Sequence, residues 1–63
     1  MLKKLTKNIL EYTVIFEPDE DSGYVAHVPV LDNIATEGDT FEETVENVKD
    51  AITGVIAVMK EEG

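Results

Sequence analysis

The chain has 63 residues, 14 of them acidic and 5 basic, so its formal net charge is −9, and it contains no cysteine. The absence of cysteine excludes a disulfide framework, a thiolate nucleophile and a metal bound by cysteine sulfur. The negative charge repels phosphate groups and so argues against direct binding to nucleic acid or to an anionic membrane. No apolar run approaches the roughly 20 residues of a membrane span, and the first residues do not lead into the apolar core of a signal peptide. We therefore expect one cytoplasmic domain over residues 1–63.

The small size of the chain predicts self-association. A domain of about 60 residues buries only about 60% of the surface that its unfolded chain exposes. Small domains without disulfides or a metal commonly gain the missing stability by assembling. We therefore expect a homodimer or a larger homo-oligomer.

The first predicted strand covers residues 12–16, which are rich in β-branched and aromatic types, and Pro18 ends it. The residues before it fit either a brief helix or an extension of this strand, and we favour extension from about Asn8. A polar stretch that ends in Gly23 leads to a second apolar strand over residues 24–28. The two strands are predicted to pair as a hairpin.

A third, shorter strand is predicted over residues 34–37. Pro29 ends the strand before it, and Asp32 and Asn33 supply the residue types of a turn. The third strand runs into Gly38, which separates it from the element that follows.

A helix is predicted from Thr40 to about Lys60. Thr40 and Glu43 have the spacing of a capping box, in which the hydroxyl accepts from a helix amide and the carboxylate accepts from the amide of the cap residue. Gly54 lies inside the helical pattern, either at a cost of about 1 kcal/mol relative to alanine or as the site of a close packing contact. Apolar residues recur at steps of three and four and form one stripe, which needs a sheet to cover it. The stripe consists of Phe41, Val45, Val48, Ile52, Val55, Ile56 and Met59.

These elements predict an α+β fold of β-β-β-α order, a three-stranded antiparallel meander with one C-terminal helix packed on one face. The first strand carries apolar side chains on both sides, with Val14 and Phe16 on one side and Ile15 on the other. A strand with one solvated face alternates more cleanly. We therefore expect a second layer of protein, from an identical chain or a partner, to cover the open face or the sheet edge.

Several short segments stand in an order and spacing that together are specific. They are residues 12–18, 19–21, 23–26 and 28–29, followed by Ala35-Thr36, Gly38-Asp39-Thr40, Glu42-Glu43, Asn47, Lys49 and Ala51-Ile52. This set resembles the HicB-like antitoxin family of HicA/HicB toxin–antitoxin systems, in its short form with the N-terminal domain only. The chain differs from that family at residues 31–34, where a Pro-Gly-Cys-type turn is usual. Many members carry a further DNA-binding module after the helix, so operator binding is not expected of these 63 residues.

The resemblance implies a truncated ribonuclease H-like fold that acts by binding, with no enzyme activity and no cofactor. It also implies the partner, a small basic HicA-like toxin that cleaves messenger RNA and has a double-stranded-RNA-binding-type fold with a catalytic histidine. A strongly acidic protein suits such a partner, because its charge steers it onto the basic site and competes with the phosphates of RNA. Occlusion of that site would inhibit the toxin.

The densest acidic cluster of the sequence consists of Glu17, Asp19, Glu20 and Asp21 at the turn of the predicted hairpin. We interpret it as a contact surface for a basic partner. A solvated hairpin tip is the plainer alternative, and a magnesium or calcium site would need several of these oxygens to converge although no EF-hand spacing is present. His27 is the only histidine and has no nucleophile motif beside it, so we interpret it as a structural or partner-binding residue and not as a general base.

Two other functions stay open at this stage. The first is a stand-alone oligomeric interaction domain of the same fold with no toxin partner. The second, and the least favoured, is a metal-dependent hydrolase that uses the acidic tip.

Overall fold

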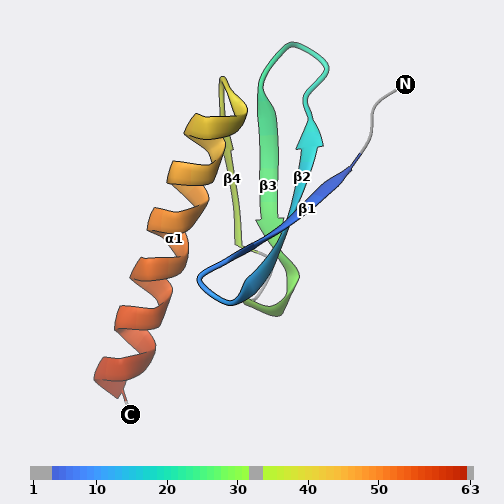
Figure 1. Ribbon diagram of the computed structural model, residues 1–63. Helices are drawn as coiled ribbons and strands as arrows, with labels where there is room; N and C mark the ends of the chain where they lie inside the picture. The colour runs from blue at the N-terminus through green and yellow to red at the C-terminus, as the bar shows by residue number, and fades with distance from the viewer. Residues whose placement is uncertain (1–3, 32–33, 63) are drawn as a thin grey trace.

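The computed structural model describes residues 4–31 and 34–62. The elements follow in the order β1 (Leu5–Ile9), β2 (Tyr12–Pro18), β3 (Tyr24–Val28), the short 3-10 helix η1 (Pro29–Leu31), β4 (Ile34–Gly38) and α1 (Phe41–Glu62). The strands form one antiparallel sheet in the order β1-β2-β3-β4, and α1 lies along one face of it (Figure 1). The predicted α+β class is confirmed, but the predicted number of strands is wrong, because the sheet has four strands and not three.

The additional strand is β1, whose last residues, from about Asn8, we expected to extend the next strand. It pairs with β2 from Leu5 opposite Phe16 to Ile9 opposite Tyr12. Leu10 and Glu11 connect the two strands with φ angles of 51° and 73°. A two-residue hairpin loop with positive φ at both positions is a type I′ turn, which is normally built from asparagine and glycine. The expected extension from Asn8 is therefore wrong, because these two residues reverse the chain without the usual turn signal.

The predicted hairpin is confirmed, since β2 pairs with β3 from Ile15 opposite His27 to Pro18 opposite Tyr24. The third predicted strand is β4, which pairs antiparallel with β3. Between them Pro29 ends β3 and begins η1. The turn predicted at Asp32 and Asn33 lies outside the described residues.

Two glycines bring the β2–β3 loop against the junction of β4 and α1. Gly23 has a φ of 80°, and a Cβ at this position would collide with the carbonyl oxygen of Gly38. A Cβ on Gly38 would in turn lie 2.7 Å from the amide nitrogen and from Oγ1 of Thr44 in the first turn of the helix. Neither position accepts a larger residue without movement of the backbone, so the hairpin loop and the start of α1 are held close together.

The capping box predicted at the start of the helix is confirmed in part. The Glu43 amide donates a 3.0 Å hydrogen bond to Thr40 Oγ1, which is the expected cap. The reciprocal bond from the Thr40 amide to the Glu43 carboxylate is absent from the described hydrogen bonds. Thr44 is fully buried, and its hydroxyl donates to the Thr40 carbonyl at 2.7 Å. α1 continues to Glu62, two residues beyond the predicted end.

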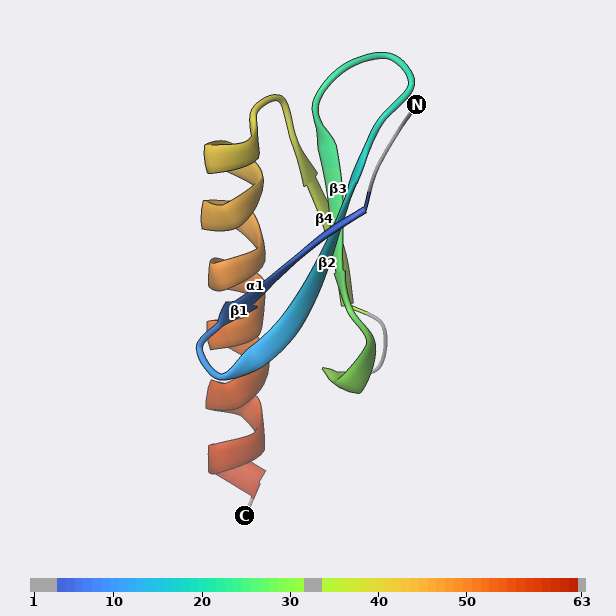
Figure 2. The same ribbon diagram turned by 45° about the vertical axis from the view of Figure 1, so that its right-hand side comes forward.

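The core lies between the sheet and α1. Its fully or nearly fully buried apolar residues are Ile9, Val14, Phe16, Ala26, Val28, Val48 and Ile52. The ring of Phe41 packs 4.8 Å from that of Phe16, centroid to centroid, and 5.5 Å from that of Tyr24. The predicted helix stripe is buried in its middle and exposed at Met59, because α1 runs past the end of the sheet (Figures 1 and 2).

The other face of the sheet has no covering element among the described residues. Cross-strand partners point to the same side of a sheet, so the register places Thr6, Ile15, His27 and Ala35 in one row across this face. Ile15 is half-buried, and His27 lies beside it with the same partial exposure. The predicted apolar character of this face is thus confirmed at Ile15, and we refer to it as the open face.

Relief of the strained β1–β2 turn should stabilise the protein. Leu10→Asn combined with Glu11→Gly installs the residues that type I′ turns favour, and the expected gain is about 1 kcal/mol, or a rise of about 4–8 °C in Tm. Thermal unfolding followed by circular dichroism measures it. Glu20→Gly is the matched control, since Glu20 is exposed and has no positive φ. Loss of stability in the double variant would show that the turn is built differently.

Substitution by alanine should change the stability in opposite directions at Gly54, inside α1, and at Gly38, at the end of β4. Nothing lies within 4 Å of a Cβ on Gly54, so its interpretation as a close packing contact is wrong, and Gly54→Ala should gain about 1 kcal/mol of unfolding free energy. Gly38→Ala should lose about 1–3 kcal/mol, because the backbone of Thr44 blocks the added methyl group. Urea unfolding measures both changes, and a shared sign would contradict this packing.

Candidate protein-binding surface

The predicted partner-binding residues fall in two places. Glu17 and His27 lie on the open face, where Oε1 of Glu17 is 3.5 Å from Nε2 of His27. The same oxygen is 4.0 Å from Nζ of Lys4. The side chains of His27 and Glu17 are 31% and 44% exposed, so the contact is screened by solvent and adds little stability. It fixes one carboxylate and one imidazole side by side at the surface.

The other three predicted residues lie on the loop between β2 and β3. Asp19, Glu20 and Asp21 are exposed, and the Asp19 amide donates a 3.0 Å hydrogen bond to the Gly23 carbonyl, which closes the loop. Asp19 and Asp21 line a hollow of about 390 Å³ next to the start of α1. Glu20 does not line it, so the sequence cluster divides between the open face, the loop tip and this hollow.

The hollow gathers carboxylates from three separate parts of the chain. Its lining residues are Asp19, Asp21, Ser22, Tyr24, Glu37, Gly38, Asp39 and Glu43. We call this set the acidic hollow. Glu37, Asp39 and Glu43 were not predicted as site residues. They lie next to the hairpin loop through the β3–β4 register and the close approach of Gly23 to Gly38. The one signal in the sequence is this pair of glycines, one at the end of the β2–β3 loop and one at the end of β4.

The acidic hollow is strongly negative and contains no lysine. Its five carboxylates stand where the exposed amides of the helix N-terminus partly offset their charge. In the described part of the chain, no three histidine, aspartate or glutamate side chains converge closely enough to hold a metal ion. The arrangement is suited to cationic groups that approach from outside, because each of its five carboxylates is exposed and none forms an ion pair within residues 4–31 and 34–62.

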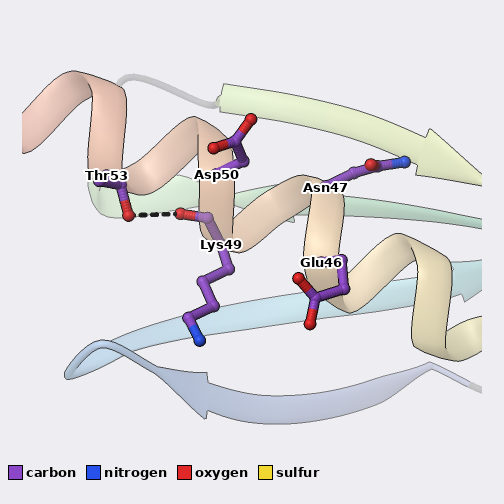
Figure 3. Close-up of a pocket in the computed structure, with 5 residues that line it drawn as sticks. All are labelled: Glu46, Asn47, Lys49, Asp50 and Thr53. Carbon is purple, nitrogen blue, oxygen red and sulfur yellow. Dashed lines mark hydrogen bonds between the residues drawn. The ribbon is translucent and has the colours of Figure 1, made fainter.

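A second hollow of about 350 Å³ lies on the exposed side of α1 and is lined by Glu46, Asn47, Lys49, Asp50 and Thr53 (Figure 3). In this view Glu46 and Lys49 point toward β1 and β2, whereas Asn47 and Asp50 lie nearer β4. The Asn47 side-chain amide donates a 2.8 Å hydrogen bond to the Glu37 carbonyl, which otherwise belongs to the outer edge of β4. These side chains diverge and carry both charges, so this hollow brings no reactive groups together.

None of the helical segments in the described residues combines the length and the apolar character that a bilayer crossing requires.

Comparison with known proteins finds relatives that share a name. The chain is 46% identical over 46 residues to a UPF0150 protein of Synechocystis sp., a match that spans 73% of this chain and 58% of the relative. It is 43% identical over 51 residues to a UPF0150 protein of Thermoplasma acidophilum and 35% identical over 51 residues to one of Archaeoglobus fulgidus, with 81% of this chain and 74% of the relative covered in both cases. The chain thus spans little more than half of the Synechocystis protein. No family model matches it, and no solved structure matches it.

The melting temperature should rise with salt, because screening weakens the repulsion between carboxylates in the acidic hollow as the Debye length falls from about 30 Å at 0.01 M to about 8 Å at 0.15 M. Asp21→Asn with Glu37→Gln should reduce this response. Glu11→Gln with Glu46→Gln changes the net charge equally, lies outside the hollow and should change the response less. Differential scanning calorimetry across a NaCl series measures the slopes.

The same series in MgCl2 at matched ionic strength tests the hollow as an ion site. We expect the melting temperature to rise by a similar amount with NaCl and with MgCl2. A larger, saturable rise with MgCl2 that disappears in the Asp21/Glu37 variant would indicate a bound ion instead, since a ligand of the folded state stabilises it by mass action.

Proposed function

Because this chain belongs to the UPF0150 family and its segments resemble HicB-like antitoxins, we propose that it is a non-catalytic antitoxin that binds and occludes a small, basic, RNA-cleaving toxin of the HicA type. The proposal includes a truncated ribonuclease H-like fold and a cytoplasmic site of action. The partner is identified by its chemistry, a cationic surface that otherwise meets RNA phosphates.

The observation that carries the proposal is the acidic hollow. Five carboxylates of an already acidic chain stand together between the hairpin loop and the first turn of α1. Such a surface raises the local concentration of a basic protein and speeds its association, especially at low salt. It presents to the toxin the kind of charge that the toxin's RNA substrate presents, so bound antitoxin and RNA compete for the same cationic groups.

The pair of Glu17 and His27 supports a second area of contact. Both side chains are partly exposed and stand on the open face beside Ile15. A partly exposed carboxylate and imidazole next to an aliphatic group offer polar and apolar contacts at the same place, as protein interfaces commonly do.

A stand-alone oligomeric interaction domain is the second candidate. It is favoured by the open face, where Ile15 and Val25 are only half-buried and Ala35 is exposed. An identical chain that covered this face would add a third layer, on the side of the sheet opposite α1, to a domain of only two layers. The metal-dependent hydrolase remains the least favoured candidate, because Glu17 and the loop carboxylates lie apart.

The antitoxin proposal predicts that charge reversal in the hollow abolishes neutralisation. The test uses the basic, histidine-containing protein encoded next to this chain, if the native genome has one, co-expressed with it in cells that the toxin arrests. Asp19→Lys with Asp21→Lys should lose rescue of growth and weaken binding by about tenfold or more, since each lost or reversed contact is worth up to about 1 kcal/mol. Titration calorimetry at low salt measures the affinity.

Glu11→Lys with Asp50→Lys is the matched control, because it changes the net charge equally at exposed residues outside the acidic hollow and outside the predicted contact cluster. It should keep rescue and bind within about threefold of the unchanged chain. The proposal fails if no basic protein is retained at low salt and growth is never rescued, or if both pairs of substitutions weaken binding to the same extent.

A further inference from the structure

The helix-facing side of the sheet is covered unevenly: Val14, Phe16, Ala26 and Val28 are fully buried, whereas Leu5 and Lys7 at the start of β1 are exposed. Four strands spaced about 4.8 Å apart present a surface wider than one helix, whose diameter with side chains is about 10 Å. α1 packs chiefly on β4 and β3. In Figure 2, β1 runs at an oblique angle to α1 instead of parallel to it. The start of β1, with Leu5 and Lys7, therefore remains accessible on this face, whereas Ile9 at its end is buried in the core.

This accessible area contains a groove of about 280 Å³ between β1 and α1, lined by Lys7, Phe41, Glu42, Val45 and Glu46. We call it the β1–α1 groove. Phe41 forms a fixed part of its lining, because the ring is packed against Phe16 and Tyr24. Leu5 lies on the same face of β1 as Lys7 and is 47% exposed. The groove thus has an aromatic and aliphatic interior with room for a large apolar side chain.

The rim of the groove is charged in an ordered way. Glu42 and Glu46 follow each other by one helical turn, so they stand on the same side of α1. Lys7 stands on the strand side. Lys49 points to the same side of α1 as Glu46 (Figure 3) but does not line the groove. An occupant therefore meets two carboxylates along the helix and one ammonium group along the strand.

This charge pattern argues against a second copy of the chain as the occupant. The helix of a second copy would bring four exposed carboxylates in its first three turns, Glu42, Glu43, Glu46 and Asp50, against the single Lys49. These would face the carboxylates of the rim, and like charges held close together destabilise an interface. A segment with lysine or arginine at the same positions would find them complementary.

We propose that the β1–α1 groove receives an amphipathic helix of a basic partner protein, with an apolar side chain seated against Phe41 and Val45 and cationic side chains beside Glu42 and Glu46. A helix of this kind would complete the second layer of the fold, covering the part of the sheet that α1 leaves free. The inference rests on the proposed function for the basic character of the partner, and it names a docking place distinct from the acidic hollow.

The probe is a synthetic peptide of about 18 residues, long enough for five helical turns, with leucines at steps of three and four and lysines on both flanks. A scrambled peptide of the same composition and a peptide with glutamate in place of lysine are the controls. We expect only the basic amphipathic peptide to bind at 0.15 M salt. In two-dimensional NMR, the amide signals of Lys7, Phe41 and Val45 should shift more than those of the hairpin loop.

Exposed rim residues give variants that keep the fold. Glu42→Gln with Glu46→Gln should weaken binding of the peptide by about fivefold. Glu11→Gln with Asp50→Asn, which changes the net charge equally at exposed residues outside both the groove and the acidic hollow, should weaken it less than about twofold. The inference is overturned if the scrambled peptide binds as well, if both pairs weaken binding equally, if the shifts map to the acidic hollow, or if no peptide binds. It is also overturned if dilution of the protein alone produces the same shifts, since a second copy would then occupy the groove.

Failure of the inference about the β1–α1 groove can be distinguished from failure of the antitoxin proposal. If Glu42→Gln with Glu46→Gln leaves toxin neutralisation unchanged while Asp19→Lys with Asp21→Lys abolishes it, the groove is not a docking place for the toxin and the proposed function holds. If the peptide binds in the groove but no toxin is neutralised, the groove stands as a basic-helix site and the proposed function fails.

Discussion

The fold depends on the burial of one sheet face beneath a single helix. The contact between Phe16 on β2 and Phe41 in the first turn of α1 stands at the centre of this arrangement, with Val48 and Ile52 continuing the same surface. A fully buried aliphatic or aromatic side chain contributes about 1.5–3 kcal/mol, and the conformational entropy of ordering the chain opposes the sum. With only two layers, few side chains share this role, so each position that sets the helix against the sheet matters.

The approach of helix to sheet is set at its N-terminal end by small residues and hydrogen bonds. Gly38 lets β4 pass within contact distance of Thr44, and the buried hydroxyl of Thr44 is satisfied by the carbonyl of Thr40. A larger residue at position 38 would push the first turn away from the sheet. Because Phe41 lies in that turn, such a shift would also disturb the aromatic contact on which the core depends.

Most of the fold could be predicted from the sequence because its signals are local. The cap at Thr40, the stripe of α1 and the run of β-branched and aromatic residues in β2 each follow from residues close together in the chain. β1 could not be predicted because only Ile9 of its five residues is buried, which leaves no alternation to read, and because Leu10 and Glu11 form a turn with residues that rarely adopt it. The strain at this turn is held by the pairing of the strands on either side.

The candidate site was less predictable because it is assembled by tertiary contacts. Of the four carboxylates that cluster in the sequence, only Asp19 and Asp21 line the acidic hollow, since successive residues of a strand point to opposite faces and Glu17 therefore lies on the open face. The hollow adds Glu37 and Asp39 to these two through strand register. Only a prediction of which residues of β4 stand opposite β3 would have found them.

The first turn of α1 connects the two surfaces. Glu42 lines the β1–α1 groove and Glu43 lines the acidic hollow, and these neighbours in sequence point to different sides of the same helical turn. Phe41, directly before them, is the ring that joins helix to sheet. A basic protein that seats a helix in the groove would thus extend over the helix N-terminus toward the hollow, where its remaining cationic groups meet the carboxylates of the hairpin loop. The uneven covering of the sheet and the uneven distribution of charge therefore favour the same end of the molecule for contact with a partner.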